Sequence, residues 1–211
     1  MITMKEFEKR TGVRFNMNMS GKMFGVNCLS TSNLVNPFCA ARKKDPDCIC
    51  SKCFADTTCK RYAALNRNMI RNTEILTSRL FSVDEMPAVT GPIFRLESFG
   101  DLVNALQCVN YFRLCKANTA VRFALWTKNP GFVRQALQTE EKPENLVILL
   151  SSAEIGKKAD AVRWWFIDKT FTVYRHDEMP PEMINCGSRA CLACQRCYSK
   201  DTENDIREYL K

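Results

Sequence analysis

Short apolar runs alternate along the chain with longer segments in which apolar residues recur every three or four positions. The short runs predict strands at 21–29, 93–97, 121–126, 146–150 and 171–174. The longer segments predict helices at 54–80 and 101–117, and a short helix that ends at Leu137. Strands that alternate with helices are typical of a parallel sheet built from right-handed crossovers, so we expect an α/β fold.

The end of the chain differs from this alternating pattern. Residues 200–211 are rich in charge and predict a short capping helix. We therefore expect two regions: an α/β domain at 1–180, and a segment at 181–211 that carries a cysteine loop and this helix.

Polar residues follow each predicted strand. Glu97-Ser98-Phe99-Gly100-Asp101 follows the second strand, Thr127-Lys128-Asn129 the third and Ser151-Ser152-Ala153-Glu154 the fourth. In parallel α/β sheets the functional groups collect at the carboxyl ends of the strands. Glu97, Asp101 and Lys128 are therefore our candidates for binding a cofactor, although Asp101 is also predicted to cap the helix at 101–117.

Arg95 is the charged residue inside the second predicted strand. A period of two places Arg95 and Glu97 on the same face of that strand. Because a buried charge needs a partner, the sequence predicts an ion pair of Arg95 with Glu97 or Asp101, with a contact to substrate as the alternative.

Twelve cysteines are the most unusual feature of the composition. The N-terminal residues lack the apolar block of a secretory signal, and no apolar run is long enough to cross a bilayer, so we expect a cytoplasmic protein without a membrane partner. Disulfides are rare in the cytosol, where clustered thiols more often bind metal. Cys108 and Cys115 fall in a helical pattern and are predicted to be core thiols.

Four cysteines near the C-terminus, here called the rear quartet, have the spacing CxxxxCxxCxxC: Cys186, Cys191, Cys194 and Cys197. Zinc ribbons usually separate two CxxC knuckles, whereas consecutive CxxC steps in one loop are more typical of a [4Fe–4S] cluster. The spacing therefore favours an iron–sulfur cluster, and zinc is the alternative. Four thiolates would leave such a cluster without an open position.

A second set near the N-terminus, here called the front group, comprises Cys39, Cys48, Cys50 and Cys53. Cys50 and Cys53 form its tightest knuckle, and Cys39 and Cys48 compete for a third place. Cys59 lies in the following helical segment, where a structural role is expected. The front group predicts a second metal site at the rim of the sheet, next to the cofactor candidates.

The formal net charge of +8 suggests an anionic partner such as nucleic acid. This sum counts cysteines as neutral. Eight thiolates (−8) around two cores of charge +2 (+4) would add −4 and leave +4. Basicity is therefore weak support for a nucleic-acid partner, and a solvated surface explains it equally well.

Several short motifs occur in an order that resembles the bacteriophage gene product 88 family. They are a cysteine-rich loop, Cys53-Phe54-Ala55 opening a helix with Arg61-Tyr62 and Asn66 or Asn72, F-R-L-E-S-F-G-D, R-F-A-L-W-T-K-N-P, and a terminal C-x4-C-x2-C-x2-C-Y. The resemblance extends from about Cys28 to Tyr198 and implies a phage or mobile-element origin.

The layout also resembles radical S-adenosylmethionine (SAM) enzymes. In that family a cysteine loop after the first strand of a partial parallel (β/α) barrel binds a [4Fe–4S] cluster that leaves one iron for SAM. This chain departs from the family in its CxCxxC spacing at Cys48, Cys50 and Cys53, and in lacking a glycine-rich segment after the second strand. The resemblance implies a partial barrel and SAM-dependent redox chemistry on a small-molecule or nucleic-acid substrate.

The sequence therefore leads to three hypotheses about function. The first is an iron–sulfur protein with one or two clusters and radical-SAM-like redox chemistry. The others lack catalysis: a zinc protein that binds nucleic acid, and a host-interaction protein whose cysteine sites hold a small fold together.

Overall fold

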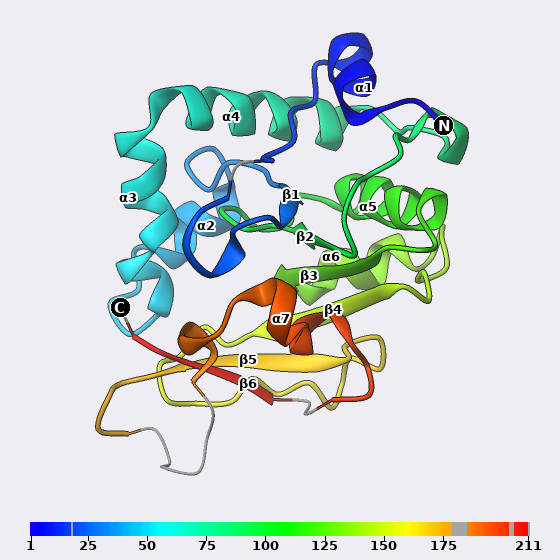
Figure 1. The fold of residues 1–211 in the computed structure, drawn as a ribbon. Coiled ribbons are helices and arrows are strands. Elements are labelled where there is room, and N and C mark those ends of the chain that lie inside the picture. The colour runs from blue at the N-terminus through cyan, green and yellow to red at the C-terminus, as the bar shows by residue number, and fades with distance from the viewer. Residues whose placement is uncertain (18, 179–184, 203–204, 211) are drawn as a thin grey trace.

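A single parallel sheet organises the molecule in a computed structural model, which describes all residues except 18, 179–184, 203–204 and 211 (Figure 1). The strands are β1 (Asn27–Leu29), β2 (Ile93–Leu96), β3 (Arg122–Thr127), β4 (Leu146–Ser151), β5 (Lys169–Tyr174) and β6 (Asp205–Tyr209). Their order in the sheet is the order in the chain, and every neighbouring pair is parallel. The α/β class and parallel sheet are confirmed. The sheet is open, and the partial barrel stays a prediction with which this strand order agrees.

Seven helices in the described residues connect or cover these strands: α1 (Met4–Thr11), α2 (Pro37–Arg42), α3 (Phe54–Arg61), α4 (Ala63–Ser78), α5 (Ala105–Ala117), α6 (Pro130–Ala136) and α7 (Cys191–Cys194). Short 3₁₀ turns lie at Gly21–Met23, Ile49–Lys52, Val83–Glu85, Cys186–Ser188 and Arg196–Tyr198. None of these helices combines the length and apolar character that a membrane crossing requires.

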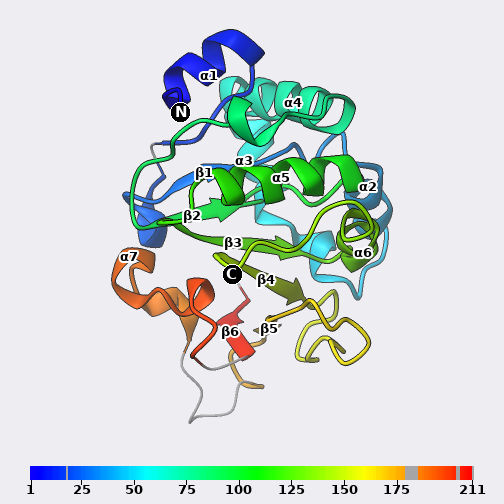
Figure 2. The same ribbon diagram turned by 90° about the vertical axis from the view of Figure 1, so that its right-hand side faces the viewer.

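Both faces of the sheet are apolar, and alternate strand residues bury them against different partners. Phe94 and Phe123 belong to a core that also contains side chains of α1, α4, α5 and α6. Ile93 and Trp126 point the other way, into a smaller core that includes side chains of the segment around α7. Figure 2 shows α7 set apart from α4 and α5. The rear quartet therefore lies in the layer that covers the second face of the sheet.

The predicted C-terminal helix is wrong, because residues 205–209 form β6 and pair with β5. Asp205 accepts a hydrogen bond from Thr170 Oγ1 at 2.7 Å and forms an ion pair with Arg207 at 2.9 Å. The charged residues of this segment, which in the sequence predicted a solvated helix, are instead satisfied by contacts that form when the segment pairs with β5. The predicted domain boundary at residue 180 falls outside the described residues and stays a prediction, but β6 belongs to the same sheet as the other strands.

Two other predicted elements are shorter or interrupted. Of the predicted first strand at 21–29, only Asn27–Leu29 is extended, because Gly21 and Gly25 adopt left-handed backbone angles (φ 60° and 76°) that interrupt a strand. The predicted helix at 54–80 is two helices, α3 and α4, with a break at Tyr62.

The start of α5 also differs from the prediction. Asn104, rather than Asp101, is the N-cap, since its side chain accepts a hydrogen bond from Gln107 N at 2.9 Å. The predicted end of this helix at Ala117 is confirmed, and so is the burial of Cys108 and Cys115 inside it. Asp101 is consequently available for other contacts at the rim of the sheet.

Candidate metal centres

The rear quartet lies in a compact loop whose turns are set by local hydrogen bonds. Asn185 accepts a hydrogen bond from Gly187 N at 3.1 Å and starts the first 3₁₀ turn at Cys186. Gln195 has a left-handed backbone (φ 51°), which ends α7 after one turn. The chain therefore reverses between Cys194 and Cys197 instead of continuing as a helix.

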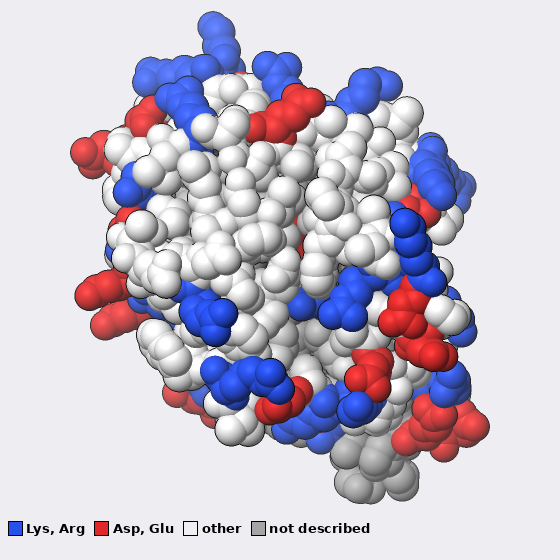
Figure 3. Space-filling view, turned by 180° about the vertical axis from the view of Figure 1, so that it is seen from behind, with Lys and Arg blue, Asp and Glu red and all other residues white. Residues whose placement is uncertain are grey.

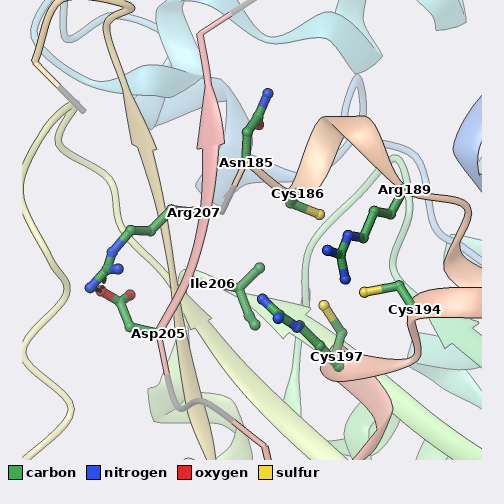
Figure 4. A pocket seen from close by; sticks show the side chains of 9 residues that line it. Asn185, Cys186, Arg189, Cys194, Cys197, Asp205, Ile206 and Arg207 are labelled. Atoms are coloured by element: carbon green, nitrogen blue, oxygen red, sulfur yellow. Dashed lines mark hydrogen bonds and ion pairs between the residues drawn. The ribbon is translucent and has the colours of Figure 1, made fainter. Parts of the chain in front are cut away.

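The thiols of the quartet face one another, as Figure 4 shows for Cys186, Cys194 and Cys197, with the Arg189 side chain beside them. A hydrogen bond from Cys197 lowers the pKa of Cys186 to about 6, and nearby Lys22 acts in the same direction. The same bond, together with burial, raises the pKa of Cys197. The Lys22 ammonium lies 3.6 Å from Cys186 Sγ. Cys191 lies close enough to Cys186 and Cys194 for their charges to raise its pKa, although burial is the larger cause.

The half-buried side chain of Arg95 lies close to this loop. The Arg95 guanidinium carbon is 3.2 Å from the centre of the Trp126 ring, and the Trp126 and Tyr198 ring centres are 6.1 Å apart. Burial raises the pKa of Cys191, and the hydrogen bond with Cys186 raises the pKa of Cys197. The positive charge of Arg95 has a smaller, opposite effect and lowers both pKa values. Arg95 Nε and the Tyr198 hydroxyl are both buried without a hydrogen-bond partner.

The predicted ion pair of Arg95 with Glu97 or Asp101 is wrong for the part of the chain that the structure describes. Glu97 follows the last residue of β2 and has a left-handed backbone (φ 57°). This conformation breaks the period of two, so that its carboxylate contacts α5 while Arg95 faces the rear quartet. Whether Arg95 contacts a substrate stays a prediction.

The front group lies in the segment between β1 and α4, and this segment is attached to the end of β4. Cys39 is in α2, and Cys48, Cys50 and Cys53 lie in or beside the 3₁₀ turn Ile49–Lys52. Ile49 N donates a hydrogen bond to Ala153 O at 2.8 Å, and Cys48 forms an isolated bridge with Glu154. The predicted meeting of this loop with the carboxyl end of the fourth strand is confirmed.

The four front thiols lie near one another and near the polar rim. Burial raises the pKa of Cys39, and the charges of Asp101, Cys50, Glu97 and Cys53 raise it further. Burial also raises the pKa of Cys50 to about 12, with Cys48 and Cys53 acting in the same direction and Lys128 opposing them. Sulfur atoms from one loop thus meet charged groups from the ends of β2 and β3.

Glu97 is the centre of a buried hydrogen-bond network behind this group. Its carboxylate accepts hydrogen bonds from Gln107 Nε2 at 2.7 Å, from Thr31 Oγ1 at 3.0 Å and N at 3.2 Å, and from the Tyr111 hydroxyl. Burial raises its pKa to about 7, although these hydrogen bonds oppose the shift. A Cβ at Gly100 would lie 2.5 Å from Thr31 O and 2.7 Å from the Glu97 carboxylate, so this close approach requires glycine.

Asp101 connects the ends of β2 and β3. Its carboxylate accepts hydrogen bonds from Thr127 Oγ1 at 2.6 Å, Leu102 N at 2.7 Å and Lys128 N at 2.9 Å. The carboxylates of Asp101 and Glu97 are therefore occupied within the protein. Within the described residues the Lys128 ammonium forms no ion pair, which makes Lys128 the strongest of the three predicted cofactor-binding residues.

No group of three or more His, Cys, Asp or Glu side chains in the described residues has the geometry to hold a metal ion. All twelve cysteines are free thiols. The metal assignments of the rear quartet and the front group remain predictions. The structure adds residues that the sequence did not assign to these sites: Lys22, Trp126 and Tyr198 beside the rear quartet, and Thr31, Gln107 and Tyr111 around Glu97. Tyr198 directly follows the last cysteine, and only this adjacency could have indicated its position.

Comparison with known proteins identifies one relationship. The family model described as gene product 88 matches residues 8–207. No curated protein and no solved structure matches the chain.

Proposed function

We propose that this chain, which belongs to the gene product 88 family, is an iron–sulfur protein with a [4Fe–4S] cluster on the rear quartet and a second cluster on the front group. The family match also supports the predicted bacteriophage origin. When bound, such clusters supply one-electron redox chemistry.

The observation that carries the proposal is the convergence of two separate sets of four thiols. Cys186 contacts Cys197 across the rear loop, and Cys39 lies near Cys50 and Cys53 at the rim of the sheet. Four nearby free thiols are the donor set that Fe–S clusters and structural zinc require. Two such sets in one chain are difficult to explain by packing, because Cys108 and Cys115 already show how this protein buries structural thiols.

The surroundings of the rear quartet fit an anionic cluster. Four thiolates around a core of charge +2 have a net charge of −2, which favours nearby cations and hydrogen-bond donors. Lys22, Arg95, Arg189 and Arg196 are cations near the quartet. The unpartnered Arg95 Nε and Tyr198 hydroxyl are donors. The surroundings of the front group fit an anionic cluster less well. Lys128 supplies a cation near Cys50, but the acidic residues Asp101 and Glu97 lie near Cys39.

Zinc is the competing metal. One zinc ion would hold four sulfurs at about 2.3 Å from the metal, and hence about 3.8 Å from one another. A four-iron cluster accepts a wider spacing, because each sulfur binds a different iron. The consecutive CxxC steps of the rear quartet within one loop favour the cluster over zinc.

The test is anaerobic purification followed by measurement of iron, sulfide and zinc. We expect a brown protein with about eight irons and eight sulfides per chain, about four of each per cluster. A colourless protein that contains stoichiometric zinc after the same purification would reject the proposal.

We further propose that the front cluster is the place of any SAM-dependent reaction, because its loop lies between β1 and α3, at the carboxyl end of the sheet beside Lys128. For this reaction Cys50, Cys53 and either Cys39 or Cys48 would bind the cluster, which would leave one iron for SAM. The ammonium of Lys128 would bind the carboxylate of SAM. We expect SAM to change the EPR spectrum of the reduced protein, and Lys128→Gln to weaken this response while the iron content is unchanged. An unchanged spectrum at saturating SAM would limit the protein to electron transfer or a structural role.

The nucleic-acid alternative rests on the net charge of +8. On the face drawn in Figure 3, acidic and uncharged side chains interrupt the basic ones, so no continuous basic stripe crosses it. A phosphate backbone favours a continuous basic track. The distribution of charge on this face therefore does not support the alternative of a non-catalytic protein that binds nucleic acid.

A further inference from the structure

Arg95 is a half-buried cation whose Nε is fully buried. Its guanidinium forms no ion pair with a carboxylate in the described residues, and its Nε is buried without a hydrogen-bond partner. Stacking on Trp126 at 3.2 Å stabilises the charge but leaves the N–H donor unsatisfied. A buried N–H donor without a partner is costly, so an acceptor is expected beside the Nε, and an anionic one would also match the charge.

The side chains above Arg95 place it beside the rear quartet. Trp126, on which Arg95 stacks, contacts Tyr198 edge-on at 6.1 Å, and Tyr198 directly follows Cys197. Trp126 and Tyr198 belong to the same apolar cluster, against which Cys191 and Cys197 pack. The Arg95 charge is also felt by both thiols.

Arg189 and Arg196 also line the quartet. Lys22, a further cation there, differs from Arg95 because it has its own carboxylate. Its ammonium lies 2.7 Å from Glu208 and 3.6 Å from Cys186 Sγ. Glu208 is the ion-pair partner of Lys22, whereas Arg95 forms no ion pair with a carboxylate in the residues that the structure describes.

We propose that Arg95 is a positioning residue that provides the counter-charge of the rear cluster and raises its reduction potential. This inference rests on the proposed function. Reduction adds one negative charge to the cluster, and a nearby positive charge stabilises the reduced form relative to the oxidised form. The Nε–H also supplies a donor for a thiolate sulfur, of the kind that tunes cluster potentials.

The experiment compares Arg95→Gln, Arg95→Lys and wild-type protein, each with its clusters bound. Arg95→Gln is expected to shift the midpoint potential of the rear cluster to a more negative value and to speed its loss to an iron chelator by about 10-fold to 100-fold. Arg95→Lys keeps the charge and is expected to restore most of the potential. The potential of the front cluster should stay unchanged in both variants.

The matched control is Arg122→Gln. Arg122 is exposed and hydrogen-bonds to Gln195 in the quartet loop, so its loss disturbs the same loop without removing the charge of Arg95. We expect a wild-type potential for this control. Thermal melting of each variant separates loss of the fold from loss of the counter-charge.

Each outcome bears on one claim. If wild-type protein binds no iron, the proposed function fails. If Arg95→Gln binds iron fully with an unchanged rear potential and chelation rate, the role of Arg95 is overturned while the iron–sulfur proposal stands. A shift as large in Arg95→Lys as in Arg95→Gln would also overturn it, because charge would not be the cause.

Discussion

Cys197→Ser is expected to halve the iron content of the anaerobically purified protein, from about eight irons per chain to about four. Cys197 contacts Cys186 directly and is close to Cys191, so it lies at the centre of the rear quartet. A serine hydroxyl is a harder and more weakly ionised donor than a thiolate, and iron–sulfur clusters select soft sulfur ligands. Iron and sulfide analysis, with the EPR spectrum of the reduced protein, measures the loss.

Two further variants make this result specific. Cys50→Ser should remove the front iron and leave the rear iron, so that the two variants lose different EPR signals. Cys108→Ser is the matched control, because Cys108 is fully buried in α5 and belongs to neither site. A serine there can donate to the carbonyl four residues earlier in the helix. Full iron in Cys197→Ser, or equal loss in Cys108→Ser, would contradict the assignment.

The sheet could be predicted from the sequence because its central strands are continuous apolar runs. Residues 93–94, 123–127 and 146–151 are buried on both faces, and runs of this kind can be recognised in the sequence alone. Strand β6 could not be predicted in this way, because its charged residues are satisfied by Thr170 and by each other only after it pairs with β5.

The part of the candidate site that lies at the carboxyl ends of the strands could be predicted from the sequence. Asp101, Lys128 and the front group do meet at the carboxyl rim, as the parallel topology requires. The partners of Arg95 and Glu97 were not predictable. The left-handed backbone at Glu97 turns its side chain away from the face that the period of two predicts. The hydrophobic pattern of a sequence does not reveal a residue with such a backbone conformation.

Glu97→Ala is expected to lower the free energy of unfolding by about 2–4 kcal/mol, because it leaves buried neutral donors without an acceptor. The carboxylate accepts four hydrogen bonds, from Thr31, Gln107 and Tyr111. Without it, the Thr31 amide and the Tyr111 hydroxyl would be buried without their acceptor. Denaturant unfolding of the protein measures the loss, and Glu144→Ala at an exposed position should change stability by less than about 0.5 kcal/mol.

The pH dependence of unfolding distinguishes two causes of a stability loss in Glu97→Ala: removal of a titrating carboxyl group and loss of side-chain packing. Burial raises the pKa of Glu97 in the folded protein to about 7, from 4.5 in the unfolded chain. The folded state therefore binds this proton more tightly, and its stability should rise as the pH falls from about 7 towards 4.5. Glu97→Ala should lose that gradient, whereas Glu144→Ala should keep it. A gradient that is unchanged in Glu97→Ala would show that the carboxyl group does not titrate in this range, even if the variant is less stable.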